Sequence, residues 1–426
     1  MRKTVAMIFA GGRVEELSVL TFHRPKAAIV FGGSYRMIDF ALTNLANCEL
    51  IETVGILSQY KPSSLIDHVG IGLPWDFVGT HRAVRFLPPY TGPEASHWYR
   101  GTADALFQNL DFLELHRPDD VLIVSGDHAY QMDYMPLLRF HVERGAELTM
   151  GFTPIDLNPS RFGIAELDAE GRVMAYAEKP EKPRSNLASM TVYAFRCNVL
   201  MEELKRASEA AQGKQSFYMY DEVIPRIVAR RKAYGWVHYG GWEYARTLDG
   251  YYRVHQDMLG DVPKFDIAAM NVRTNTMSPR AAPPTPARHM PTAHVSDSIV
   301  STGCRIEGTV EHSVLSPHVH IGKGAIVRNS ILWDGVVIEE GAVVDRVIAD
   351  KRVVVGKGAR VGWGNEAPSE ELPKSLTCGA AVLGADAHVP AGAQIGRNCI
   401  LYPGVGPDQL SAGPVESGRT VRAPTR

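Results

Sequence analysis

A glycine turn followed by several basic residues is the part of this sequence best suited to bind phosphate. Gly11 and Gly12 come directly after a short apolar run that is typical of a buried β-strand. Since neither position has a Cβ atom, the backbone there can approach a ligand closely. Turns after the first strand of an α/β sheet commonly bind phosphate through outward-pointing N–H groups. Arg24, Lys26 and Arg36 follow soon afterwards, and they would bring positive charge to the same turn.

A carboxylate ends another apolar run. Asp127 follows the strand-like residues 121–126, and open α/β sheets bind ligands at the carboxyl ends of their strands. The plainer interpretation of Asp127 is a helix N-cap. The two roles do not exclude each other.

Alternating apolar runs and amphipathic stretches must position these side chains. Residues 54–60 and 148–152 are further strand candidates, and the pattern predicts an α/β fold with a mostly parallel sheet and crossover helices. We assign this domain to residues 1–275. The proline-rich stretch that follows suits neither a helix nor a central strand, so we expect a linker at residues 276–293.

A sequence repeat begins beyond this linker. Each copy has an aliphatic residue, Gly-Ala three and four positions later, and another aliphatic residue at six. The copies start at Ile321, Ile338, Val355 and Val389. Their starts are 17, 17 and 34 residues apart, close to three hexapeptides per coil, which predicts a left-handed parallel β-helix over residues 294–400. A small β-sandwich is the alternative. Residues 401–426 suggest a flexible tail.

Composition narrows the class of protein. The net charge is −2, from 45 basic and 47 acidic residues, so no overall field attracts nucleic acid or an anionic membrane. The five cysteines are scattered without metal-type spacing, as expected for reduced thiols in a cytoplasm. No segment is apolar enough to span a bilayer. We expect a soluble cytoplasmic protein without nucleic-acid or membrane partners.

Longer motifs carry a resemblance to one family. The turn Gly11-Gly12-Arg13, the later Arg24-Pro25-Lys26 and residues 98–105 resemble the sugar-nucleotide pyrophosphorylases, most closely the glucose-1-phosphate adenylyltransferases (ADP-glucose pyrophosphorylases). That family joins a Rossmann-like nucleotidyltransferase domain to a left-handed β-helix, so the resemblance covers nearly the whole chain. It implies that ATP, or another nucleoside triphosphate, reacts with glucose 1-phosphate in the presence of Mg²⁺. The products would be ADP-glucose, for glycogen or α-glucan synthesis, and pyrophosphate.

The resemblance also implies roles for individual residues. Catalytic roles fall on Arg13, Lys26 and Asp127, and Asp127 would also bind Mg²⁺. Nucleotide contacts fall on Gly11, Gly12, Gln59, Gly101 and Thr102. Sugar-phosphate contacts fall on Tyr99, Glu178, Lys179 and Ser189, and an anionic effector would contact Arg24 and Arg36.

Plainer interpretations exist for several of these motifs. Residues 98–105 could be a loop-to-helix cap, and Glu178 and Lys179 a solvated surface pair. Arg24 and Arg36 could be ordinary surface arginines. The unbroken match over residues 98–105, and the correct distance from Lys179 to the later serine motif, favour binding roles.

Several positions depart from the family pattern. Val14 replaces the third glycine of the turn, and Glu16 replaces its second arginine. Tyr244 replaces the aspartate that is the family's second metal carboxylate, and Arg246 follows it. The family's Asp-Phe-Gly becomes residues 218–220. One loop has lost a cation and the other a carboxylate, so we predict that Glu16 and Arg246 have exchanged charges and lie close together. The alternative is that both are surface replacements in a site that no longer works.

Two functional classes follow. The first is an active nucleotidyltransferase, and the second is a catalytically weak or inactive regulatory paralogue that binds sugar phosphate. Acyl transfer by the β-helix, using His312, His318 or His320, is a weaker third possibility. The resemblance implies a homo-tetramer, or a hetero-oligomer with an active paralogue.

Overall fold

The computed structural model describes residues 2–90, 98–156, 159–277, 283–410 and 413–424. The chain divides into two compact units. The N-terminal unit comprises Met1–Gly12 and Met37–Glu243, and the β-helix unit comprises Arg13–Arg36 and Tyr244–Arg426. The excursion at residues 13–36 therefore belongs with the C-terminal half, unlike in the continuous domain predicted over residues 1–275.

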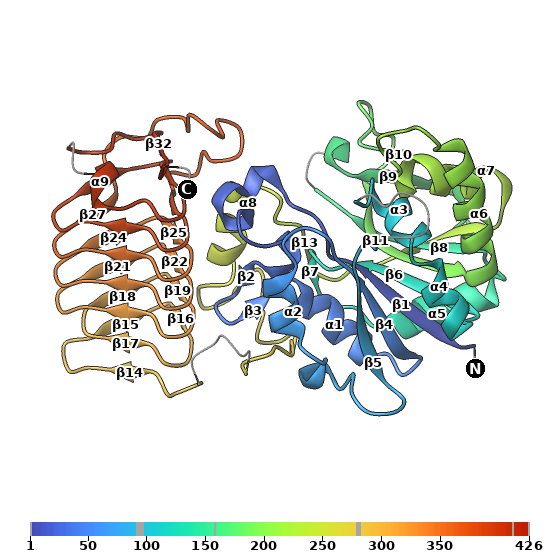
Figure 1. The fold of residues 1–426 in the computed structure, drawn as a ribbon, viewed down its shortest axis with the longest axis horizontal. Coiled ribbons are helices and arrows are strands. Elements are labelled where there is room, and N and C mark those ends of the chain that lie inside the picture. The colour runs from blue at the N-terminus through green and yellow to red at the C-terminus, as the bar shows by residue number, and fades with distance from the viewer. Residues whose placement is uncertain (1, 91–97, 157–158, 278–282, 411–412, 425–426) are drawn as a thin grey trace. The chain divides into compact units, whose positions relative to one another are not determined.

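A mixed sheet forms the N-terminal unit, with strand order β10-β9-β11-β6-β1-β4-β5 and with β8 joining β11 to β12 (Figure 1). Its strands are β1 (Thr4–Phe9), β4 (Ile51–Leu57), β5 (Ala83–Leu87), β6 (Asp120–Ser125), β8 (Leu148–Pro154), β9 (Gly163–Leu167), β10 (Val173–Glu178), β11 (Leu187–Arg196) and β12 (Ala233–Val237). The segment β6-β1-β4-β5 is parallel, and its strands β1, β4 and β6 are those that the sequence predicts. Strand β11 is antiparallel to β6 and β8.

Helices flank this sheet (Figure 1). They are α1 (Ile38–Ala46), α2 (Ser63–Val69), α3 (Thr102–Phe107), α4 (Leu110–His116), α5 (Tyr134–Glu143), α6 (Cys197–Ala210) and α7 (Ile224–Arg230). Short 3₁₀ turns occur at η3 (Leu73–Trp75) and η4 (Pro159–Arg161), and a π-helical turn at η5 (Met219–Val223). A separate two-stranded antiparallel sheet pairs β7 (Ala129–Tyr130) with β13 (Trp242–Glu243).

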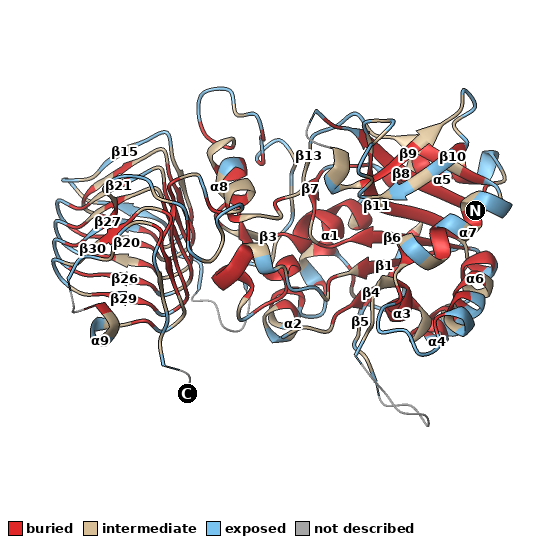
Figure 2. Cartoon of the chain, turned by 90° about the horizontal axis from the view of Figure 1, so that it is seen from above, coloured by how far each residue is buried: buried red, intermediate tan, exposed pale blue. Residues whose placement is uncertain are grey.

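Burial explains why the apolar runs became central strands. Figure 2 shows the central strands of this sheet in red, as buried residues. Val5, Met7, Val121 and Ile123 are at most 1% exposed and share one hydrophobic core. Continuous apolar strands of this kind are expected where both faces of a sheet are covered.

Three parallel sheets form the solenoid of the β-helix unit. The first contains β14 (Arg288–His289), β17 (Arg305–Ile306), β20 (His320–Ile321), β23 (Val337–Ile338), β26 (Val354–Val355) and β29 (His388–Val389). The second contains β15 (His294–Ser296), β18 (Thr309–Glu311), β21 (Ile326–Arg328), β24 (Val343–Asp345), β27 (Arg360–Trp363) and β30 (Gln394–Gly396). The third contains β16 (Ile299–Val300), β19 (Val314–Leu315), β22 (Ile331–Leu332), β25 (Val347–Ala349), β28 (Ala381–Leu383), β31 (Ile400–Leu401) and β32 (Thr420–Val421).

The predicted repeat sets the register of this left-handed parallel β-helix. Ile321, Ile338, Val355 and Val389 stack on one another through successive strand pairs. All four side chains are fully buried. The template glycines have φ of +66° to +70°, a conformation that favours glycine and lets each coil turn its corner.

An excursion of about one coil interrupts the stack without shifting it. Val355 pairs directly with Val389, so the extra residues leave between β27 and β28 and return to the same register.

The boundary predictions need two corrections. Strand β14 already begins within the predicted linker, at residue 288. In the predicted flexible tail, α9 (Pro407–Leu410) forms and β32 pairs with β31, because Thr420 and Val421 continue the third sheet.

The excursion at residues 13–36 folds against the β-helix within this unit. It contains η1 (Glu15–Thr21), η2 (Lys26–Ala28) and a hairpin of β2 (Val30–Phe31) with β3 (Tyr35–Arg36), and α8 (Leu248–Gln256) packs beside it. His255 of α8 accepts a hydrogen bond from the Gly32 N–H at 3.1 Å. The Trp333 indole donates to the Tyr251 hydroxyl at 2.9 Å, and that hydroxyl donates to the Val30 carbonyl.

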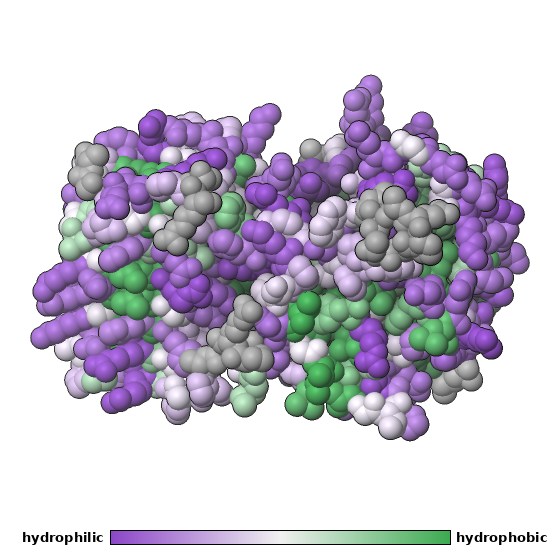
Figure 3. Space-filling view, viewed as in Figure 1, coloured by the Kyte–Doolittle hydropathy of each residue, from purple (hydrophilic) through white to green (hydrophobic). Residues whose placement is uncertain are grey.

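Two surface properties bear on partners. None of the helices that the structure describes is both long enough and apolar enough to cross a membrane. The N-terminal unit presents an apolar patch, green in Figure 3. Among the large apolar side chains exposed in this unit are Ile66, Ile71 and Leu73, which are 42%, 72% and 66% exposed.

Candidate functional site

The glycine turn after β1 has one position closed to a side chain and one that is open. A Cβ atom at Gly11 would lie 3.1 Å from the Gln59 backbone nitrogen, whereas one at Gly12 would meet nothing within 4 Å. The Gly11 carbonyl accepts from the Tyr60 N–H at 3.3 Å. The nearby Gln59 backbone therefore explains why position 11 is a glycine, whereas the open space beside Gly12 leaves room for a ligand.

Gln59 contacts the backbone of Tyr99. Its amide nitrogen donates to the Tyr99 carbonyl at 3.4 Å, and its amide oxygen accepts from the Tyr99 N–H. The Tyr99 hydroxyl donates to the Leu87 carbonyl and accepts from Asn109, both at 2.9 Å. Burial raises the pKa of Tyr99 to about 12. The structure thus brings these two predicted ligand residues together, with their polar groups engaged by the protein.

Gly101 and Thr102 start α3 and hold the segment before η5. A Cβ atom at Gly101 would lie 2.4 Å from the Phe217 carbonyl oxygen, so a larger residue would collide there. Thr102 Oγ1 accepts from the Met219 N–H at 3.0 Å. Asp104 accepts from the Arg100 N–H at 2.9 Å, and Gly101, the N-cap residue of α3, makes no side-chain cap hydrogen bond. A nucleotide role for Gly101 and Thr102 stays a prediction.

Asp127 lies just beyond β6, at the carboxyl edge predicted from the sequence. Its Oδ1 accepts from Ser125 Oγ and lies 3.5 Å from His128 Nε2. Its side chain is 21% exposed. Strand β7 follows rather than a helix, so the N-cap interpretation is wrong.

One accessible carboxylate is the donor that Mg²⁺ needs when substrate phosphates and water supply its other oxygens. The described residues include no group of three His, Cys, Asp or Glu side chains able to hold a metal ion. Asp127 therefore fits a magnesium ion carried mainly by a nucleotide.

The predicted sugar-phosphate residues form a connected group, which we call the Glu178 cluster: Tyr176, Glu178, Lys179, Ser189 and Tyr193. Glu178 accepts from the Tyr176 hydroxyl at 3.2 Å and lies 3.6 Å from Lys179 Nζ. Ser189 Oγ lies 3.0 Å from the Tyr193 hydroxyl, and the two tyrosine side chains are hydrogen-bonded. The solvated-pair interpretation of Glu178 and Lys179 is therefore incomplete, because Glu178 is part of a partly buried network.

The backbone is irregular at two places in the Glu178 cluster. Strand β11 has a register shift between Ser189 and Val192, and such bulges redirect side chains at ligand sites. Lys179 has φ of +47°. Gly163, opposite Glu178 on β9, leaves room for it, since a Cβ atom there would lie 2.8 Å from Glu178 Oε2.

Sequence reasoning missed three residues here. Tyr176 and Tyr193 lie two positions before Glu178 and four after Ser189, spacings that place each pair on one strand face. Burial raises the pKa of both tyrosines, so their hydroxyls stay protonated and can donate. Asp221 of η5 interacts electrostatically with Lys179, and no motif pointed to it.

The departures from the family pattern contact one another in the β-helix unit. Arg246 Nε donates to Glu16 Oε1 at 3.2 Å, so the predicted proximity of this pair is confirmed. Arg246 also forms a side-chain hydrogen bond with Tyr244, and although burial opposes it, the nearby Tyr244 and Glu16 raise the pKa of Arg246. The Nζ of Lys26 lies 3.8 Å from the centroid of the Tyr244 ring. We call these four residues the Lys26 cluster.

A strained serine anchors the loop that carries Glu16. Ser18 has φ of +41° and ψ of −119°, a costly conformation for a residue with a Cβ atom. Its hydroxyl donates to Glu371 at 2.7 Å. Glu371 also accepts from Tyr402 at 3.0 Å and from Arg422 at 2.8 Å. The loop that carries Glu16, in which Arg13 is exposed beside Val14, is thus fixed to the C-terminal coils.

The predicted effector arginines pair with β-helix carboxylates. Arg24 is 6% exposed, its guanidinium is 2.8 Å from Asp350, and it lies 5.1 Å above the Trp333 ring. It is therefore not an ordinary surface arginine. Arg36 lies 3.7 Å from Asp334, and Lys351, which sequence reasoning missed, lies 3.6 Å from the same carboxylate. Burial and the nearby Arg36 lower the pKa of Lys351 to about 8.

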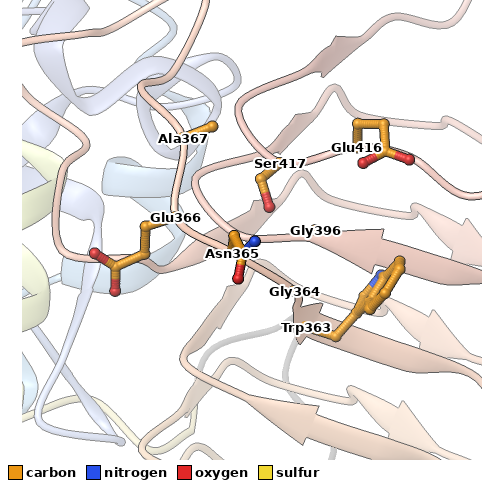
Figure 4. Close-up of a pocket in the computed structure, with 8 residues that line it drawn as sticks. All are labelled: Trp363, Gly364, Asn365, Glu366, Ala367, Gly396, Glu416 and Ser417. Atoms are coloured by element: carbon orange, nitrogen blue, oxygen red, sulfur yellow. The ribbon is translucent and has the colours of Figure 1, made fainter.

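The solenoid also contains a pocket and the histidines that were considered for acyl transfer. A pocket of about 470 Å³ is lined by Trp363, Gly364, Asn365, Glu366, Ala367, Gly396, Glu416 and Ser417, and Figure 4 shows their arrangement. None of the predicted site residues lines it. Of the histidines considered for acyl transfer, His312 pairs with Asp297, and His320 lies 3.4 Å from Glu307.

Two family models match successive parts of the chain. A family model described as nucleotidyl transferase matches residues 5–260, and one described as GlmU-like, C-terminal hexapeptide matches residues 285–377.

Similar curated proteins include three glucose-1-phosphate adenylyltransferases. That of Thermomicrobium roseum is 41% identical over 442 residues, covering 99% of this chain and 98% of its own. That of Thermotoga maritima is 40% identical and covers 98% of each chain. That of Acetivibrio thermocellus is 36% identical and covers 99% and 98%. The resemblance drawn from the motifs is confirmed, and the chain belongs to the glucose-1-phosphate adenylyltransferase family of nucleotidyltransferases.

Proposed function

We propose that the chain transfers an adenylyl group from ATP to glucose 1-phosphate, giving ADP-glucose and pyrophosphate for glycogen or α-glucan synthesis. The observation that carries this proposal is the Glu178 cluster, whose carboxylate, ammonium and hydroxyl groups suit the hydroxyls and phosphate of a sugar phosphate. The names of the relatives supply the choice of substrates.

In the reaction, a phosphate oxygen of glucose 1-phosphate attacks the α-phosphorus of ATP, and the bond from that phosphorus to the pyrophosphate oxygen breaks. Glu178 would accept hydrogen bonds from glucose hydroxyls, and Lys179 would bind the sugar's phosphate. Arg13 and Lys26 would neutralise charge on the triphosphate, while Gly11 and Gly12 let the backbone approach it. Most of the catalysis would come from positioning and charge neutralisation.

Mg²⁺ would be held by Asp127 together with nucleotide phosphates. When bound, it would withdraw charge from the phosphate oxygens and help to orient them. In this protein Asp127 is held by Ser125, so the carboxylate is oriented before a ligand arrives.

A second candidate is a weak or inactive paralogue that binds sugar phosphate and regulates an active partner. The enclosed position of Lys26 against Tyr244 favours it, as does the pairing of Glu16 with Arg246. On this candidate the Glu178 cluster would still bind glucose 1-phosphate.

Pyrophosphate release from purified protein with ATP, glucose 1-phosphate and Mg²⁺ tests the first proposal. We expect release that depends on glucose 1-phosphate and that falls when glucose 6-phosphate or another nucleoside triphosphate is substituted. Binding of glucose 1-phosphate by calorimetry without any pyrophosphate release would replace it with the second candidate.

Assembly and regulation extend the proposal. We expect a homo-tetramer, or a hetero-oligomer with an active paralogue, in the cytoplasm, and light scattering at micromolar concentration would measure the mass of the purified chain. Arg24, Arg36 and Lys351 carry three positive charges against two from Asp334 and Asp350, which supports binding of an anionic effector. A titration with sugar phosphates and sulfate, followed by turnover, tests the effector role.

A further inference from the structure

Lys26 is enclosed in this structure although its family role requires it to contact phosphate. Its side chain is 2% exposed, and its Nζ atom is inaccessible to solvent. The Tyr244 ring lies 3.8 Å from that atom. An ammonium withdrawn from water is costly unless other groups replace its hydration, and the face of an aromatic ring is one such group.

Two further residues that depart from the family pattern, Arg246 and Glu16, connect to this ring. Tyr244 is hydrogen-bonded to Arg246, and Arg246 forms an ion pair with Glu16. Glu16 sits on η1, which Ser18 fixes to Glu371. The three replaced residues therefore form one chain of contacts that ends on the lysine.

We propose that Tyr244 is an affinity-determining residue whose ring competes with phosphate groups for the Lys26 ammonium. The proposal rests on the proposed function in taking the competing ligand to be the pyrophosphate part of a nucleoside triphosphate. Because the ring lies against Nζ, a phosphate that binds this ammonium replaces the contact between the ring and the cation.

Two substitutions separate the ring face from the rest of the side chain. Tyr244→Leu keeps an apolar side chain but removes the aromatic face, whereas Tyr244→Phe keeps the face and removes only the hydroxyl. With Mg²⁺ and inorganic pyrophosphate as the probe, calorimetry should show about tenfold tighter binding in Tyr244→Leu than in wild type. Tyr244→Phe should stay close to wild type. Tyr239→Leu, at a position that is 84% exposed, is the matched control and should change nothing.

A second readout does not depend on the enzyme's activity. Trace labelling with acetic anhydride, followed by peptide mass spectrometry, compares the reactivity of Lys26 with that of exposed lysines in the same sample. Lys26 should react faster in Tyr244→Leu than in wild type or Tyr244→Phe. If Lys26 labels faster but no variant binds pyrophosphate, the ring covers the lysine and the proposed function fails instead.

Three results would overturn the proposal. The first is weaker pyrophosphate binding in Tyr244→Leu than in wild type, which would make the ring a support for the lysine. The second is measurable binding of equal strength in wild type and Tyr244→Leu. The third is unchanged labelling of Lys26. Tighter binding that persists when Lys26→Met is added to Tyr244→Leu would also overturn it, because the gain would not come from Lys26.

Discussion

The Glu178 cluster and the Lys26 cluster differ in how far their residues match the family pattern. In the Glu178 cluster every predicted ligand residue matches the family, and hydrogen bonds through Tyr176 and Tyr193 link Glu178 to Ser189. In the Lys26 cluster three of four residues are replacements, and they contact one another and the lysine. The first group keeps the residues predicted to bind a sugar phosphate, whereas in the second the replaced residues contact one another and Lys26.

The difference teaches that the replaced charges of the Lys26 cluster are paired with each other. A glutamate placed alone beside triphosphate would cost several kcal/mol, since a unit charge pair at ~4 Å is worth roughly 4 kcal/mol at an effective dielectric near 20. Here Glu16 has Arg246 as its partner at 3.2 Å. Whether both are surface replacements in a site that no longer works is decided by the turnover measurements below.

The largest expected effect is at Asp127. Asp127→Asn should lower Mg²⁺-dependent turnover by about a thousandfold or more, because the amide removes the charge that a magnesium ion needs. Steady-state pyrophosphate release at several Mg²⁺ concentrations measures it. Asp133→Asn, at a helix N-cap on the same unit, is the control. Turnover in Asp127→Asn within tenfold of wild type would exclude Asp127 as the magnesium ligand.

Restoring the family residues tests whether the Lys26 cluster limits turnover. Glu16→Arg alone should give little gain, because Arg246 loses its partner and Tyr244 still replaces the second metal carboxylate. Glu16→Arg combined with Tyr244→Asp should raise turnover by at least about tenfold over either single variant, a non-additive result expected of groups that act together. A fast wild type that Glu16→Ala leaves equally fast would show that the departures are harmless.

The Glu178 cluster should bind glucose 1-phosphate whether or not the protein turns over. Lys179→Ala should weaken that binding about tenfold, through loss of a charge-assisted phosphate contact. Lys182→Ala removes an exposed lysine nearby in the sequence and should have no effect. Calorimetry that gives equal affinities for wild type and Lys179→Ala would remove the assignment of this cluster.

The smallest effect concerns the turn of the hairpin that follows Lys26, where His255 contacts Gly32. His255 is fully buried, and burial lowers its pKa to about 4. The unfolded chain therefore binds more protons than the folded one between about pH 6.5 and 4, and stability falls as the pH falls through that range. We expect a loss of ~1 kcal/mol in the free energy of unfolding between about pH 6.5 and 5.5. Urea unfolding of wild type and His255→Gln measures it, and the same slope in both would assign the loss to other groups.

Local patterns predicted much of the fold. The six-residue period fixed which side chains of the solenoid point inward, since Ile321, Ile338 and Val355 occupy equivalent places in successive coils. The apolar runs likewise gave the parallel strands β1, β4 and β6. The placement of residues 13–36 could not be predicted, because it depends on pairs such as Arg24 with Asp350, which are distant in sequence and carry no periodic signal.

Motifs predicted the site unevenly for the same reason. Glu178 and Ser189 were recognisable from short matches, but the tyrosines between them matter through buried hydrogen bonds that only the folded strands create. The pairing of Glu16 with Arg246 was predictable from complementary losses of charge. The ring of Tyr244 over Lys26 was not, because nothing in a sequence tells whether an aromatic side chain faces a cation.

The attachment of residues 13–36 to the last coils has a consequence for synthesis on the ribosome. Ser18 reaches its partner Glu371, and Glu371 in turn reaches Arg422, so the early segment is held by residues made near the end of translation. Contacts this distant in sequence form late and carry a high loop-closure cost. The emerging chain can complete its N-terminal sheet long before the loop that carries Glu16 can contact Glu371. A nascent chain that stalls before the excursion between β27 and β28 would therefore carry a folded sheet with an unfinished loop, a form that proteases and chaperones can distinguish from the completed protein.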